Sequence, residues 1–208
     1  ATGSGWGGKY VMDTVAAGTG GRLPALANMP PHHQDGASGK HQYMPWGLYQ
    51  QQAAGKLDFA RGYHIEFGGG RRMPGAWTVG GLADHTGGAY GQRLKEEARR
   101  YYGTSMGFAG RGEMIPNDDC YCEIDPDGKV DQWGSPTLKF HWKWSDHELN
   151  QARHMQHTFR DIIQAMGGTV TSTVHDDGAD AIAKPGEIIH EVGGAIMGDK
   201  PERSVVNE

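Results

Sequence analysis

The sequence predicts a mixed α+β fold in which a largely antiparallel sheet carries helices on one side. Short stretches with strand character and two helical stretches follow one another, separated by turns of glycine and proline. The 34 glycines have no collagen-like period, so they indicate tight turns rather than a regular helical bundle. The 208 residues are enough for one domain with its own core, or for one domain and a piece of a second.

Strands and one long loop are expected in the N-terminal part of the chain. Residues 9–16 are β-branched and alternating, which predicts a short strand between glycine clusters. Residues 17–40 combine many turn residues with little apolar periodicity, and a loop of this length is typical of lids and binding loops. Further strands are expected at residues 41–43 and 62–67, the second ending at the glycines 68–70.

The first predicted helix is charged and amphipathic. It covers residues 92–102 and ends at Gly103, since glycine readily takes the left-handed conformation of a helix C-terminus. Residues 104–115 and 121–124 are expected to be extended.

A hairpin and a second helix are expected next. Residues 126–128, Pro-Asp-Gly, predict a turn, and residues 137–144 carry the strongest strand signal in the chain. Ser145 and Glu148 have the spacing of a capping box, which predicts the start of a long helix that reaches Met166.

Composition argues against several classes of protein. Asp and Glu number 25 against 20 Lys and Arg, and the only dense basic stretch is residues 93–100, so nucleic acid is not an expected partner. No apolar run reaches the roughly 18 residues of a membrane span, and the N-terminus lacks the pattern of a signal peptide. Cys120 and Cys122 imply no disulfide framework. The chain opens on Ala1 and stops without a cap at Glu208, so we expect it to be part of a longer protein.

Histidines on the second helix raise the question of a metal site. His147, His154 and His157 could share one helix face, although no cysteine or carboxylate at a matching spacing completes a tetrahedral set. Residues 3–8 have the glycine spacing of a dinucleotide fingerprint, but no strand precedes them and no helix follows. Residues 125–128 resemble the start of a calcium loop without its later glutamate, which favours a hairpin turn.

Two strand faces are candidates for binding. His64 and Glu66 lie on one face of the strand over residues 62–67, where they could form a polar substrate wall or simply face solvent. Trp142 and Trp144 share a face of the later strand, where they could stack on a sugar ring or, as we expect, fill the core.

The most specific stretch is residues 186–207, GEIIHEVGGAIMGDKPERSVVN. It resembles the C-terminal signature of the glucose-methanol-choline (GMC) oxidoreductases. The matching positions are His190, Gly193, Met197, Gly198, Asp199, Pro201, Ser204, Val205 and Val206. Upstream, GKYVMDT, RGYHIEFGGG, GFAGRGEM and FHWKWSDHE resemble the branch of sugar and sugar-acid dehydrogenases, such as gluconate 2-dehydrogenase and glucoside 3-dehydrogenase. The resemblance extends over nearly the whole chain.

The chain departs from the family pattern in three respects. Ile196 stands where an arginine commonly precedes the Met-Gly pair. The Rossmann part that holds most of the flavin is absent, and so is the terminal segment with a second histidine or an asparagine. We therefore expect the chain alone to be inactive.

The resemblance implies a flavin chemistry with His190 as the base. Oxidation of an alcohol by hydride transfer requires a group that takes the hydroxyl proton, and an imidazole with an intrinsic pKa of about 6.5 suits that role. Ile188 and Ile189 predict partial desolvation of His190. Without the surrounding signature, His190 would be taken as an ordinary histidine at a strand end.

The resemblance further implies a substrate-binding domain over residues 1–185, while residues 186–208 begin the C-terminal segment that returns to the FAD domain. FAD would be bound by the longer protein. The implied partners are a sugar or polyol substrate and an electron-accepting subunit such as a cytochrome. The compartment stays open, since proteins of this branch are often periplasmic or membrane-associated through partner subunits. Two other functions compete with this one, namely a non-catalytic carbohydrate-binding module and a histidine-rich metal-binding protein.

Overall fold

The protein is described by a computed structural model, which places residues 4–27, 29–30, 42–46 (backbone), 48–71, 83 and 86–206. Its strands and helices follow in the order β1 (Val15–Arg22), η1 (Pro24–Leu26), β2 (Gln42–Trp46), α1 (Tyr49–Ala53), β3 (Tyr63–Gly69), α3 (Gly91–Tyr101), β4 (Ser105–Gly112), β5 (Tyr121–Ile124), β6 (Leu138–His141), α4 (Asp146–Ala165), β7 (Thr169–Val170) and α5 (Gly178–Ala181).

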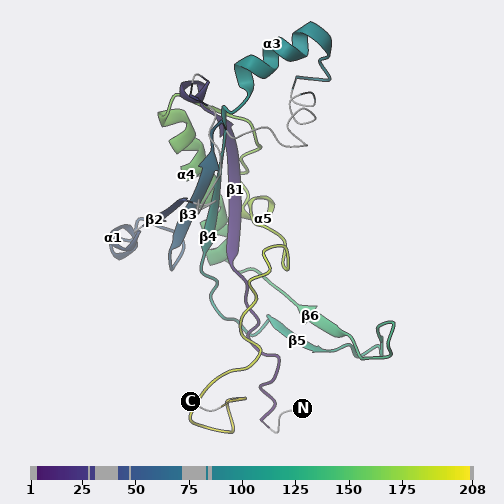
Figure 1. Cartoon of the computed structure of the whole chain (residues 1–208). Helices are drawn as coiled ribbons and strands as arrows, with labels where there is room; N and C mark the ends of the chain where they lie inside the picture. Colours follow the sequence, from purple (N-terminus) through teal and green to yellow (C-terminus); the bar gives the residue numbers. More distant parts are fainter. Residues whose placement is uncertain are drawn as a thin grey trace.

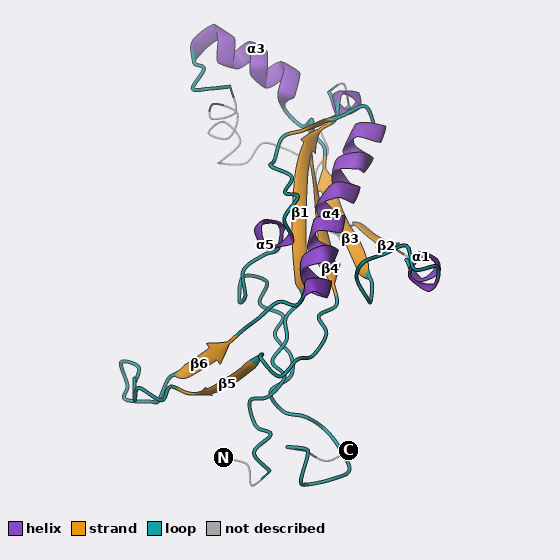
Figure 2. Cartoon of the chain, turned by 180° about the vertical axis from the view of Figure 1, so that it is seen from behind, coloured by secondary structure: helices purple, strands orange, loops and turns teal. Residues whose placement is uncertain are grey.

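The main sheet has five strands in the order β2-β3-β4-β1-β7, and every neighbouring pair is antiparallel. The long helix α4 lies against one face of this sheet (Figures 1 and 2) and contacts β1, β4 and β7. The predicted α+β fold with a largely antiparallel sheet is confirmed.

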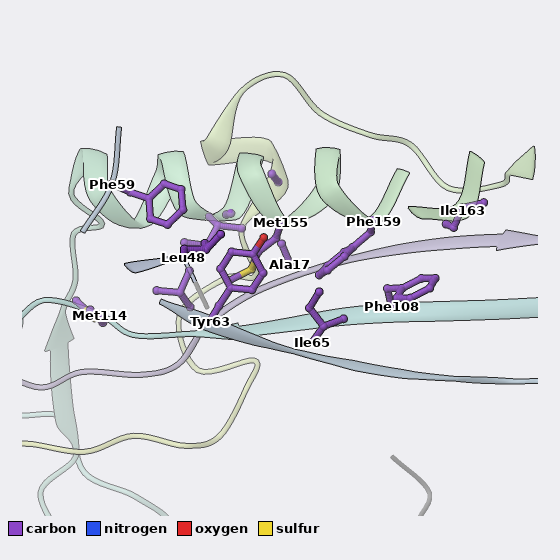
Figure 3. Close-up of a cluster of buried hydrophobic side chains, with 14 of the residues drawn as sticks. Ala17, Leu48, Phe59, Tyr63, Ile65, Phe108, Met114, Met155, Phe159 and Ile163 are labelled. Carbon is purple, nitrogen blue, oxygen red and sulfur yellow. The ribbon is translucent and has the colours of Figure 1, made fainter. Parts of the chain in front are cut away.

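The core lies between α4 and the sheet. Met155, Phe159 and Ile163 follow one another at intervals of four residues, so they share a helix face, and all three are fully buried. Their partners on the sheet include Ile65 and Phe108 (Figure 3), and the Phe108 and Phe159 rings stack with centroids 5.8 Å apart. This burial accounts for the position of α4.

The strand β1 corrects the predicted loop at residues 17–22 and the predicted strand over residues 9–16. Residue 28 and residues 31–40 of the predicted loop over residues 17–40 lie outside the described residues. The chain forms its strand later, over Val15–Arg22, in spite of the glycines that indicate a loop. A Cβ atom at Gly21 would lie 2.7 Å from Ile163 Cγ2, so only glycine lets α4 approach this closely. Tertiary packing thus overrides local propensity.

The other predicted elements lie close to their observed positions. The strand β3 runs two residues into the glycines at which it was expected to stop. The helix α3 ends before Gly103, which has a φ of +79°, and the capping box of α4 is present, with Ser145 N donating to Glu148 Oε2 at 2.8 Å. The strand β6 is shorter than expected, and Trp142 and Trp144 pack against the core as predicted.

A small hairpin projects from the body of the molecule (Figures 1 and 2). Its strands β5 and β6 pair with each other and not with the main sheet. At the same end, the N-terminal and C-terminal segments run beside each other. None of the helices formed by the described residues has the length and apolar character that a bilayer crossing requires.

Candidate functional site

The segment that carries His190 is held in a three-segment ladder made of residues 8–13, 120–122 and 190–194. Its middle segment bonds to residues 192–194 through Met12 N to Val192 O at 2.8 Å, Val192 N to Met12 O at 2.8 Å and Gly8 N to Gly194 O at 2.7 Å. On its other side it bonds to residues 120–122 through Val11 N to Cys120 O at 3.1 Å and Cys122 N to Gly8 O at 2.8 Å. The N-terminal stretch thus positions the C-terminal signature by backbone hydrogen bonds.

Asp13 fixes the backbone at His190. Its buried carboxylate accepts hydrogen bonds from His190 N at 3.2 Å and from Thr14 N at 2.7 Å. Thr14 leads directly into β1, so the carboxylate ties the signature segment to the start of the central strand. The His190 backbone is anchored while its imidazole stays outside these bonds.

The imidazole of His190 is exposed in this chain. The neighbouring Ile189 side chain is 77% exposed, so it does not cover the ring. The expected partial desolvation of His190 by its flanking isoleucines is therefore wrong for this chain, because Ile189 itself is exposed and buries none of the ring.

Backbone strain is concentrated around this site. Among the described residues, the non-glycine residues with positive φ are Tyr10 at 56°, Arg61 at 70° and Ile189 at 60°. Ile189 precedes His190 directly, and the carbonyl of Tyr10 lies where a Cβ of Gly193 would be. A left-handed conformation is unusual for a β-branched residue and tends to occur where structure serves function.

His64 and Glu66 lie on the sheet face opposite α4. They alternate with the buried Tyr63 and Ile65, and they meet Arg111 of β4, which pairs with His64. Glu66 Oε1 lies 3.3 Å from His64 Nε2, and Glu66 Oε2 lies 3.4 Å from Arg111 Nε. The His64 side chain is 41% exposed and that of Glu66 only 14%, so these residues form a partly covered polar cluster rather than an open surface.

A groove of about 750 Å³ lies at the end of the sheet nearest to Asp13. It is lined by Leu48, Tyr49, Gln52, Ala60, Arg61, Gly62, Glu113 and Ile115. Gly62 lies two residues before His64, and Glu113 lies two residues after Arg111, so both continue the sheet face that carries the cluster. Glu113 N donates to Gly62 O at 3.3 Å. Because Gly112 pairs with both Val15 and Tyr63, the groove lies two strands away from the chain that leads to Asp13, or about 10 Å.

Sequence reasoning missed Arg111 and Glu113. Both alternate with Gly110 and Gly112, which face α4, and a Cβ at Gly110 would overlap Met155 Sδ. This period of two places Arg111 and Glu113 on the face of His64. The signal was present in the sequence, but it required the pairing of β3 with β4.

The helix histidines do not converge. His147 Nδ1 accepts from Ala60 N at 3.3 Å, His157 Nε2 lies 3.1 Å from Asp176 Oδ1, and His154 Nδ1 lies 2.9 Å from the Tyr63 hydroxyl. Burial lowers the pKa of His154 below its usual 6.5 and raises the pKa of Tyr63 to about 12. Within the described residues, no group of three or more His, Cys, Asp or Glu side chains is arranged to hold a metal ion.

The glycine-rich start of the chain does not provide a flavin-phosphate site. Residues 4–8 form turns, and Lys9 then makes a bridge to Tyr121 instead of opening a helix. A pyrophosphate cradle needs a helix N-terminus behind the glycines. The described residues at the start of the chain therefore do not form the cradle that the phosphate groups of a dinucleotide need.

Comparison with known proteins agrees with the signature. Residues 116–208 match the family of GMC oxidoreductases. A relative, the gluconate 2-dehydrogenase flavoprotein of Pantoea cypripedii, is 32% identical over 93 residues, which cover 42% of this chain and 14% of that protein. The chain thus corresponds to a small part of the length of this relative.

The GMC match includes the hairpin, α4 and His190, and it starts after β4. His64, Glu66 and Arg111 lie outside the matched residues, so their place in the candidate site is argued from geometry alone.

Proposed function

We propose that this chain is part of an FAD-dependent oxidoreductase that oxidises a CH–OH group of a sugar, sugar acid or polyol, with His190 as the base. The observation that carries the proposal is that three features coincide at His190. It lies within the GMC match, follows the strained Ile189, and is anchored through its backbone to the buried Asp13. An ordinary surface histidine needs none of these features.

The role of His190 follows from the chemistry of alcohol oxidation. Bound FAD supplies the hydride acceptor in such a reaction. A base must take the hydroxyl proton as the carbon-bound hydrogen leaves, and a neutral imidazole can do this at ordinary pH. Asp13 binds only the amide of His190, and the described residues leave both ring nitrogens without a hydrogen-bond partner. One ring nitrogen is therefore available for the substrate hydroxyl.

The polar cluster and the groove would bind the substrate. His64 and Glu66, the candidates from the sequence, stand beside Arg111 on the face that leads into the groove. Arg61, Gln52 and Glu113 supply donors and acceptors for hydroxyl groups, and the exposed Tyr49 ring offers a surface for the apolar face of a sugar. This mixture of polar groups on a partly apolar groove is typical of small-molecule sites.

The division of the chain follows from this proposal. Residues 1–185 would form the substrate-binding domain, and residues 186–208 would begin the return to the FAD-binding domain. Dinucleotide binding is assigned to other parts of a longer protein, because residues 4–8 lack the required helix. Electrons would leave through an acceptor subunit such as a cytochrome.

The deciding experiment is anaerobic visible spectroscopy of the full-length protein with candidate sugars and sugar acids. We expect flavin bands that bleach with one substrate class, and a loss of at least about 100-fold in the bleaching rate in His190→Asn, since general-base catalysis contributes about that much or more. His175→Asn is the matched control, because its side chain lies on another segment and is not part of the proposed site.

Three outcomes are informative. Bleaching that persists unchanged in His190→Asn would reject the base while keeping the family assignment. Selective loss of substrate affinity in Glu66→Gln would support the polar cluster. A folded full-length protein that binds a sugar in the groove without any flavin would replace the proposal by a carbohydrate-binding module.

A further inference from the structure

A second cavity lies at the opposite end of the sheet from the groove. It has a volume of about 400 Å³ and is lined by Arg22, Pro24, Ala27, Arg100, Tyr101, Thr104, Thr169 and Thr171. Arg22 ends β1, whereas Asp13 lies just before its start. Eight strand residues span about 25 Å, so this cavity is separate from the proposed catalytic region.

Two guanidinium groups meet on one aromatic ring in this cavity. Arg22 Cζ lies 4.4 Å from the centroid of the Tyr101 ring, and Arg100 Cζ lies 5.0 Å from it. The ring orients both cations by cation–π interaction. Two positive charges from different elements, β1 and α3, are thereby brought to the same wall.

The described residues that line the cavity supply donors, and none of them is acidic. Thr169 pairs with Arg22 across the β1–β7 ladder, and Thr171 N donates to Gly20 O at 2.9 Å, so both threonines lie on the sheet face of Arg22. The Thr104 hydroxyl is already used, since it donates to Tyr101 O at 2.8 Å. Among the described residues, none makes a side-chain hydrogen bond with the guanidinium groups of Arg22 and Arg100 or with the hydroxyls of Thr169 and Thr171, which are thus available to a ligand.

The charge of Arg22 is incompletely compensated. Burial lowers the pKa of Arg22, against smaller opposing effects of Tyr101 and of Glu97, the nearby carboxylate on α3. Among the described residues, neither Arg22 nor Arg100 forms an ion pair with a carboxylate within 4.0 Å. The dipole of α3 explains a cation in its last turn, such as Arg100, but not Arg22, which comes from the sheet.

We propose that this cavity binds the phosphate group of a small organic phosphate. Two guanidinium groups and two hydroxyls match the several acceptor oxygens of a phosphate, and arginine is well suited to bidentate contacts with such oxygens. Pro24, Ala27 and the edge of Tyr101 would contact the organic part, for which the volume leaves room beyond the phosphate. The site is independent of the proposed function.

The test is isothermal titration calorimetry of the 208-residue chain at low ionic strength, with phenyl phosphate, inorganic phosphate and benzoate as probes. We expect saturable binding of phenyl phosphate that is tighter than binding of either other probe. Arg22→Gln and Arg100→Gln should each weaken it about tenfold or more, because each removes a charge-assisted hydrogen bond. Arg22→Lys, which keeps the charge but loses the planar fork, should give an intermediate loss.

Arg160→Gln is the matched control, since Arg160 pairs with Asp161 on α4, away from the cavity. Its affinity should equal that of the unmodified chain. No saturable binding, or equal losses in Arg160→Gln and Arg22→Gln, would overturn the site. Tighter binding of benzoate than of phenyl phosphate would overturn its assignment to phosphate. Circular dichroism of each variant separates loss of binding from loss of folding.

Discussion

The interface between α4 and the main sheet buries its large side chains, whereas the C-terminal segment of the three-segment ladder and the residue before it expose theirs. In the first region Met155, Phe159 and Ile163 are inaccessible to solvent. In the second, Val192 and the preceding Ile189 are exposed, whereas Val11 and Cys120 are buried, and backbone hydrogen bonds join the three segments. One region is held by the hydrophobic effect and the other by a backbone ladder.

The difference bears on where the candidate base lies. A typical intramolecular hydrogen bond contributes only about 1 kcal/mol net, so the ladder is the less stable of the two regions. His190 belongs to the ladder, and its exposed apolar neighbours are suited to contact further parts of a longer protein. The α4–sheet unit is thus the more stable region, and the ladder carries the histidine that we propose as the base.

The largest effect is expected from Phe159→Ala. Phe159 is 0% exposed and stacks on Phe108, so its truncation should lower the free energy of unfolding by about 3–5 kcal/mol. The same substitution at Phe140 is the matched control, because this hairpin residue is 57% exposed and should cost about 0.5 kcal/mol or less. Urea denaturation measures both. Similar losses in the two variants would show that the hairpin is packed in solution, and the comparison would fail.

An intermediate effect is expected from Gly193→Ala, which acts on the ladder. Gly193 has a φ of +89°, and a Cβ there would overlap the carbonyl of Tyr10. We expect a loss of about 2–4 kcal/mol in local stability from backbone strain and overlap together. Hydrogen exchange should accelerate at the amides of Met12 and Val192, while the amides of α4 stay protected.

Gly186→Ala separates strain from overlap. Gly186 also has a positive φ, +81°, but a Cβ there meets no atom within 4 Å. Its substitution should cost only about 1–2 kcal/mol, the penalty of the left-handed conformation. If Gly186→Ala opened the ladder as much as Gly193→Ala, close packing against Tyr10 would not be what holds it. Faster exchange throughout α4 would show that the two regions unfold together.

The sequence allowed the α4–sheet unit to be predicted better than the ladder. Helix signals such as the capping box at Ser145 and the glycine after α3 are local, and they proved correct. The start of β1 was misplaced because one of its glycines, Gly21, leaves room for Ile163, which lies far away in the sequence. Local patterns cannot reveal why a residue must be small.

The candidate site shows the same limit. His190 was selected from a signature, yet its anchor Asp13 lies 177 residues earlier, and no local pattern links the two. The exposure of Ile189 contradicted the expected desolvation, because hydrophobicity alone does not say which side chains find a core. The partnership of His64 and Glu66 with Arg111 required the register of β3 and β4.

The smallest effect is expected from pH, and it again separates the two regions. His154 of α4 is bonded to Tyr63 and packs on Phe59, with Asp58, Arg153 and His157 as the charged or titratable groups nearby. Burial lowers its folded-state pKa below 6.5, so as pH falls below 6.5 the unfolded chain takes up a proton that the folded chain resists. The stability of the α4–sheet unit should therefore be full above that value and decline as pH falls towards the folded pKa.

Urea denaturation at about pH 8 and about pH 5 should show a smaller decline in His154→Gln than in the unmodified chain. His175→Gln, at a site outside the Tyr63 network, should keep the decline of the unmodified chain. An unchanged pH dependence in His154→Gln would show that acid acts on the molecule elsewhere, and the ladder would then be the region to examine.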